Sequence, residues 1–99
     1  MTDPKTYEQW VRTLPCVITG ATGDNIDCHH IKGYNYLTGA GMGKKGARLL
    51  CIPLRHDVHM DLHNIGYENW EFKHNRSQLE DAVETILLAD KLGIIKVDL

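Results

Sequence analysis

The stretch "IDCHHIKG" (residues 26–33) places two histidines, His29 and His30, side by side in a run that favours a β-strand. Successive side chains of a strand point to opposite faces of a sheet, so the two imidazoles cannot both face one core. At least one of them is therefore solvated or has a role other than packing.

The segments before and after this stretch predict an α+β domain. "TDPKTYEQWVRTLP" (2–15) has the capping and periodicity of a first helix. "CVITG" (16–20) predicts a short strand, with "NIDCHHI" (25–31) as its hairpin partner. A glycine-rich loop over residues 33–47 follows, and "RLLCIPL" (48–54) predicts a second apolar strand.

The second half of the chain predicts helices. "RHDVHMDLHNIG" (55–66) favours a helix ended by its glycine, and "YENWEFKHN" (67–75) a helical turn whose Trp70 and Phe72 cover the core. Ser77 and Glu80 form a capping-box pattern at the start of a last helix. The side chains expected to face the core from that helix are Leu79, Ala82, Val83, Ile86 and Leu87.

The spacing of the histidines predicts a metal site. His59 and His63 are four residues apart and lie on one face of the expected helix. A third imidazole, from His29 or His30 on the nearby strand, would complete a set of ligands with open positions for water or substrate. The other histidine of the adjacent pair would then be available to handle a proton. The alternative is a solvated pair of surface histidines.

Basic residues are concentrated in the middle of the chain. No acidic residue occurs between Asp27 and Asp57, whereas the other parts of the chain hold six basic and thirteen acidic residues. A basic segment in an acidic protein is typical of a local contact with phosphate, and the alternative is a solvated loop. The residues expected to contact nucleic acid are Lys32, Lys44, Lys45, Arg48 and Arg55.

Length and composition predict one domain over residues 1–99, without a membrane span or a signal peptide. The expected location is cytoplasmic. Three cysteines form no disulfide framework and favour a reducing compartment, and Cys28 and Cys51 are expected to be small buried apolar residues.

The order strand, loop, strand, helix, with "HHI" and a later His-x-x-x-His, resembles the ββα-metal core of the HNH nucleases. The chain is also similar to a family of lambdoid phage and prophage proteins that has no assigned function and is grouped with the HNH nucleases. The segments that carry this similarity, within residues 13–95, are "HHI", "GMGKKGARLLCIPL", "HMDLHNIG" and "LGII".

The resemblance implies a small treble-clef-like ββα-metal core with an N-terminal and a C-terminal helix packed on it. It implies a metal-dependent endonuclease that hydrolyses phosphodiester bonds of DNA in phage DNA processing or recombination. Carried over by residue, His29, His59 and His63 would bind one divalent metal ion, and His30 would be the general base. The ion could be zinc, nickel, manganese or magnesium.

The chain departs from the family pattern at two places. Relatives carry a second, structural zinc, but only Cys16 matches its ligands, and Thr19, Arg55 and Val58 occupy the other three positions. We therefore expect that zinc to be absent. Leu50 stands in place of the family's asparagine, which leaves the partner that orients His30 unidentified.

Two other functions fit parts of this pattern. One is a non-catalytic nucleic-acid-binding module in which the metal only organises the fold, and the other is a partner-binding phage protein that uses its acidic body. DNA or RNA, duplex or branched, remain open as substrates, and a homodimer is one way for a 99-residue nuclease to cut both strands.

Overall fold

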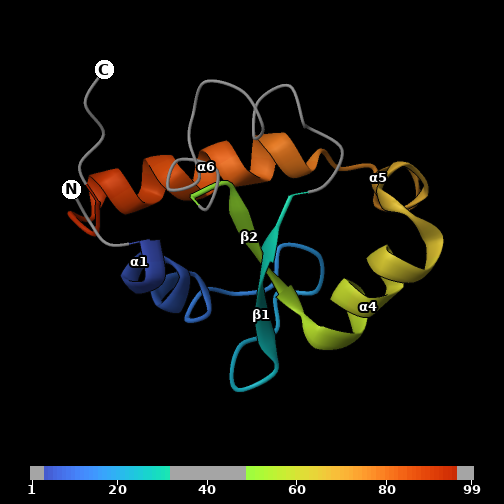
Figure 1. Ribbon diagram of the computed structural model, residues 1–99, viewed down its shortest axis with the longest axis horizontal. Coiled ribbons are helices and arrows are strands. Elements are labelled where there is room, and N and C mark those ends of the chain that lie inside the picture. The colour runs from blue at the N-terminus through green and yellow to red at the C-terminus, as the bar shows by residue number, and fades with distance from the viewer. Residues whose placement is uncertain (1–3, 32–48, 96–99) are drawn as a thin grey trace.

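The computed structural model describes residues 4–31 and 49–95 and shows a small α+β protein (Figure 1). Within these residues, four helices accompany a two-stranded antiparallel sheet. The elements in chain order are α1 (Pro4–Val11), β1 (Ile26–His30), β2 (Cys51–Arg55), α4 (His56–Ile65), α5 (Tyr67–His74) and α6 (Gln78–Lys91). The α+β class predicted from the sequence is confirmed.

The partner of β1 is β2. The register places Cys51 opposite His30 and Pro53 opposite Cys28. The hairpin predicted between residues 16–20 and residues 25–31 is therefore wrong.

Residues 16–20 form a turn in place of the predicted strand. The amide of Gly20 donates to the carbonyl of Cys16 (2.8 Å), and Gly20 has a φ of 74°, which glycine adopts without steric cost. The turn lies against β2, because the amide of Val17 donates to the carbonyl of Pro53 (3.1 Å). A short apolar run thus covers the sheet without joining its hydrogen-bond ladder.

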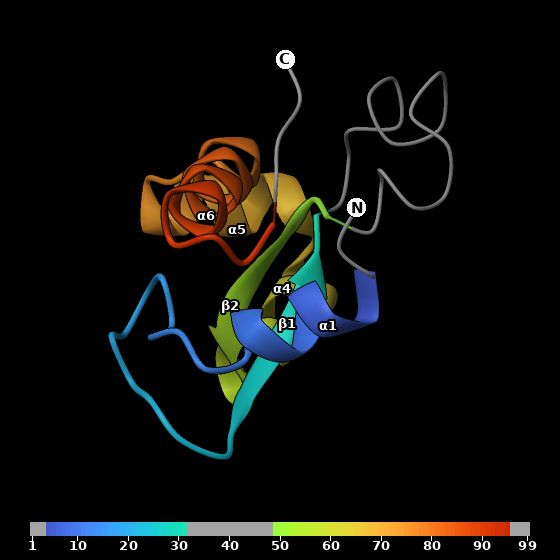
Figure 2. The ribbon, with the colours of Figure 1, turned by 90° about the vertical axis from the view of Figure 1, so that its left-hand side faces the viewer.

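The two faces of the sheet meet different helices. Figures 1 and 2 show α1 on one side of the strands, α4 on the other, and α6 across one end of the sheet. His29 and His30 point to opposite faces because they are neighbours on β1. His29 is 1% exposed on the α4 side, whereas the His30 side chain is 46% exposed and contacts α1.

Each face has its own apolar cluster. Buried residues on the α4 side include Ile52, Leu54, Leu62, Trp70 and Ala82. Those on the α1 side are Tyr7, Val11, Cys51, Ala89 and Ile95. Cys51 is fully buried, as the sequence predicts, and Cys28 is half-buried against the α1 cluster.

The helices follow the predicted capping but bury fewer apolar side chains. The hydroxyl of Ser77 accepts from the amide of Glu80 (3.3 Å), so the predicted cap of α6 is confirmed. Trp70 is buried, but Phe72 is 90% exposed, because it lies about 200° further around α5. Val83 and Leu87 are 42% and 57% exposed, so their predicted core positions are also wrong.

The stripe of α6 that is buried consists of smaller and polar side chains, namely Gln78, Asp81, Ala82, Thr85 and Ala89. Among the helices of the described residues, none has the length and apolar content needed to cross a membrane.

Candidate metal centre

Three histidines converge on the α4 face of the sheet. His29 comes from β1, and His59 and His63 lie one turn apart on α4. One ring nitrogen from each lies within 4.8 Å of the other two. The ring centroid of His59 lies 4.8 Å from that of His29 and 4.8 Å from that of His63. The structure therefore brings together the three residues predicted to be ligands.

The spacing of these nitrogens fits a single metal ion. Nε2 of His63 lies 3.1 Å from Nε2 of His59. Two nitrogens bound to one ion at 2.0–2.1 Å are separated by about 2.9 Å in octahedral and about 3.4 Å in tetrahedral geometry. The observed distance falls between these values. His63 is exposed, which leaves one side of the cluster open to solvent.

Asp27 orients His59. Oδ2 of Asp27 accepts hydrogen bonds from Nδ1 of His59 (2.9 Å) and from Nδ1 of His56 (2.7 Å). Burial raises the pKa of Asp27, but the hydrogen bonds from His59 and His56 outweigh it and hold the pKa below its usual value. A proton kept on Nδ1 of His59 leaves the lone pair on Nε2, the nitrogen that faces His63.

Gln78 orients His29 in the same way. Nε2 of His29 donates to Oε1 of Gln78 (2.8 Å), and both side chains are buried. Gln78 is held in turn by Glu71, whose carboxylate accepts a hydrogen bond from the backbone N–H of Gln78 (2.8 Å). Hydrogen-bonded partners of this kind commonly orient metal-binding histidines.

Neither Asp27 nor Gln78 was predicted from the sequence as a partner of these histidines. The sequence could have indicated Asp27, because this residue lies two positions before His29 and therefore on the same face of β1. It could not have indicated Gln78, since 49 residues separate Gln78 from His29.

His30 has a carboxylate partner on α1. Nε2 of His30 lies 2.5 Å from Oε2 of Glu8, whose side chain is 10% exposed. Glu8 is therefore the hydrogen-bond partner of His30 that the sequence left unidentified. The thiols of Cys28 and Cys51 lie beside the same imidazole.

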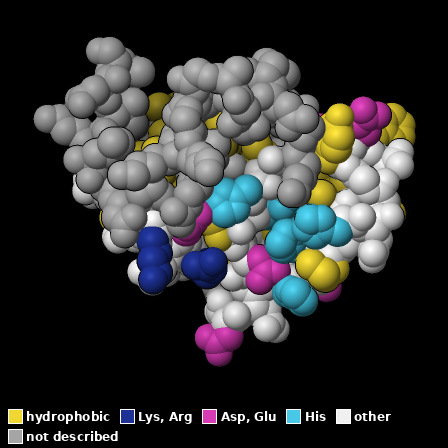
Figure 3. Space-filling model, in the orientation of Figure 1, with side chains coloured by type: hydrophobic (Ala, Val, Ile, Leu, Met, Phe, Trp, Pro, Cys, Tyr) yellow, Lys and Arg dark blue, Asp and Glu magenta, His cyan; other side chains and the backbone are white. Residues whose placement is uncertain are grey.

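Histidine side chains gather on the face of the molecule drawn in Figure 3, with acidic side chains among them. Of the five basic residues expected to contact nucleic acid, only Arg55 is described. Lys32, Lys44, Lys45 and Arg48 lie outside the described residues. The guanidinium of Arg55 donates twice to Asp57 (2.5 and 2.8 Å), and both side chains are substantially exposed.

Cys16 is the single residue that the resemblance matched to a ligand of a structural zinc. It is 3% exposed. Burial raises the pKa of its thiol, but hydrogen bonds from the Thr19 side chain and from the backbone of Arg55, Thr19 and Ile18 outweigh burial and lower the pKa. The absence of a structural zinc stays a prediction.

The fold and the three-histidine cluster define an α+β protein with a candidate metal centre. The chain belongs to the family described as "Protein of unknown function (DUF968)", which matches residues 2–93. One relative is the uncharacterized protein YdfU of Escherichia coli strain K12, 39% identical over 57 residues. That match covers 58% of this chain and only 15% of YdfU, so the chain corresponds to a small part of this relative. No solved structure matches the chain.

Proposed function

We propose that this protein is a metal-dependent endonuclease of the HNH type, with β1, β2 and α4 as its ββα-metal core. The observation that carries the proposal is the cluster of His29, His59 and His63, whose ligand nitrogens lie within 4.8 Å of one another. Buried or partly buried hydrogen-bond partners orient two of these imidazoles toward a shared point. Surface histidines that are merely solvated would not need such support.

The proposed reaction is hydrolysis of a phosphodiester bond. A divalent ion held by His29, His59 and His63 would supply positive charge to the phosphoryl group and the leaving oxygen. His30 would accept a proton from the attacking water. Glu8 would fix the ring of His30 through its hydrogen bond to Nε2 and stabilise the imidazolium that forms.

The proposed substrate is DNA. Arg55 is the last residue of β2 and directly precedes α4, the helix that carries His59 and His63. To contact phosphate it would exchange its bonds with Asp57, which is inexpensive because both side chains are exposed. The lysines and arginine of residues 32–48 would add phosphate contacts that are insensitive to base sequence.

A non-catalytic nucleic-acid-binding module is the second candidate. The observation that favours it is that His30 points to the α1 face of the sheet, away from the face that carries the three-histidine cluster. In this alternative the metal ion would connect β1 to α4 and stabilise the fold.

Nicking of supercoiled plasmid by protein stripped with EDTA tests the proposal, with magnesium, manganese, nickel or zinc returned singly. We expect metal-dependent nicking that His30→Ala abolishes while metal binding at the three-histidine cluster persists. His74→Ala, a histidine of α5 outside the cluster, is the control and should nick normally. An absence of nicking with every ion, on plasmid and on branched or single-stranded DNA, would favour the binding module.

A further inference from the structure

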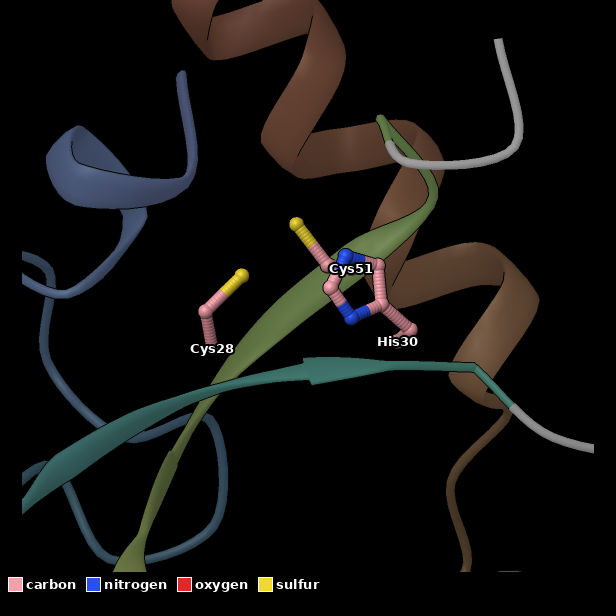
Figure 4. A group of neighbouring side chains, drawn as sticks. All are labelled: Cys28, His30 and Cys51. Carbon is pink, nitrogen blue, oxygen red and sulfur yellow. The ribbon is translucent and has the colours of Figure 1, made fainter. Parts of the chain in front are cut away.

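We propose that Cys28, Cys51 and His30 form a second metal site, on the α1 face of the sheet, for a thiophilic divalent ion such as Zn²⁺ or Cd²⁺. The two sulfurs and one ring nitrogen of His30 all lie within 4.8 Å of one another. Figure 4 shows the three side chains on the same side of the two strands. This site lies across the sheet from the three-histidine cluster.

The register of the strands explains why these residues meet. Cys51 lies directly opposite His30, and Cys28 lies two residues before His30 on β1, so all three side chains share a face. The two cysteines are therefore diagonal neighbours. Diagonal neighbours are about 7–8 Å apart between Cα atoms, beyond the usual range for a disulfide.

A metal ion bridges such a diagonal pair better than a covalent bond does. Two sulfurs bound at about 2.3 Å in tetrahedral geometry are separated by about 3.8 Å. The two sulfurs lie within 4.8 Å of each other, so small rotations of the cysteine side chains would bring them to that geometry. Neither cysteine forms a disulfide in the structure.

The polar surroundings also fit a bound cation. The carboxylate of Glu8, 7% exposed, lies 2.5 Å from Nε2 of His30 and can orient the ring or approach the ion. The hydroxyl of Tyr7 is buried and has no hydrogen-bond partner among the residues that the structure describes. Tyr7 packs in the same α1-side cluster as Cys51 and Cys28.

Charge balance favours a divalent ion. Without metal, the hydrogen bond with Cys28 and burial raise the pKa of Cys51, so the Cys51 thiol holds its proton. Binding would release one proton from each cysteine to solvent and form two metal–thiolate bonds. The two thiolates would then neutralise the charge of the ion. Two sulfurs and one nitrogen form a softer donor set than three imidazoles, so the two sites should differ in metal preference.

The site has a consequence for activity, and this part rests on the proposed nuclease function. A neutral imidazole has a single lone pair, which can bind either a metal ion or a proton. An ion held by Cys28, Cys51 and His30 would therefore remove the proposed general base. Thiophilic ions should inhibit the enzyme through this site.

Titration with Co²⁺ and Cd²⁺ tests the site without any measurement of activity. We expect two equivalents bound and the ultraviolet charge-transfer absorption of metal–thiolate bonds. Cys28→Ala should lose that absorption and one equivalent, and Cys28→Ser provides a second variant of closer volume. Cys16→Ala, which removes a cysteine outside the group, should keep both equivalents and the absorption. His59→Ala should keep the absorption and lose the other equivalent.

The outcomes separate the site from the proposed function. A lack of thiolate absorption in the wild type, or its persistence in both Cys28 variants, would overturn the site. Loss of the absorption in Cys16→Ala would show that the absorption comes from a metal bound to Cys16, and this result would also overturn the site. If the wild type nicks DNA, Cd²⁺ added at a fixed magnesium concentration should inhibit it and spare Cys28→Ala. Equal inhibition of the wild type and Cys28→Ala would refute the link between the second site and His30. A failure of the wild type to nick DNA at all would refute only the proposed function.

Discussion

Asp27→Asn should weaken metal binding at the three-histidine cluster by 10- to 100-fold, equivalent to about 1.4–2.7 kcal/mol. The Asp27 carboxylate accepts from both His59 (2.9 Å) and His56 (2.7 Å). An asparagine has one oxygen in place of two and no charge, so it supports the Nδ1–H tautomer of His59 less well. The loss matches what removal of such an orienting partner typically costs.

Asp61→Asn is a matched control for this experiment. Asp61 lies on α4 between His59 and His63 in sequence, its side chain is 33% exposed against 32% for Asp27, and it pairs with Lys73 rather than with a histidine. Affinity for Ni²⁺ or Zn²⁺, measured by competition with a chelating dye, should be unchanged in this variant. Wild-type affinity in Asp27→Asn, or an equal loss in Asp61→Asn, would refute the orienting role of Asp27.

Three further predictions test separate parts of the structure. Glu8→Gln should lower the nicking rate about 10- to 100-fold, which is part of the rate gain that a general base supplies. The variant should also shift the pH–rate profile and leave the affinity for Ni²⁺ unchanged. An unchanged pH–rate profile would remove Glu8 from the mechanism. Burial, and then the charge of Lys73, lower the pKa of His74, so the unfolded state binds its proton first and stability falls as pH drops below about 6.5. His74→Gln should flatten that fall in urea unfolding between pH 7 and pH 5, and an identical slope would contradict the reasoning. Trp70→Ala should cost about 3–5 kcal/mol in the free energy of unfolding, and Phe72→Ala less than about 0.5 kcal/mol, and comparable losses would contradict their opposite burial.

Local geometry predicted part of the three-histidine cluster, and the choice of His29 rather than His30 as its third member came from the resemblance to the HNH nucleases. Strand alternation separates His29 from His30, and one helical turn aligns His59 with His63. Both periodicities hold whatever the tertiary packing. The roles of these residues in binding or catalysis remain predictions.

The partners of these histidines could not be predicted in the same way. Glu8 lies 22 residues from His30, and Gln78 lies 49 residues from His29. Their contacts depend on how α1 and α6 pack on the sheet, and no local pattern encodes that packing. The strand pairing failed for a related reason, since a short apolar run such as residues 16–20 can either join a sheet or cover it.

The contact between the turn and β2 has a consequence for solubility. A two-stranded sheet has two open edges, and each can recruit a strand from another molecule. Pro53 has no N–H to offer an incoming strand, and its carbonyl already accepts from Val17. The centre of β2 is therefore unable to extend the sheet, which protects this edge from edge-to-edge aggregation.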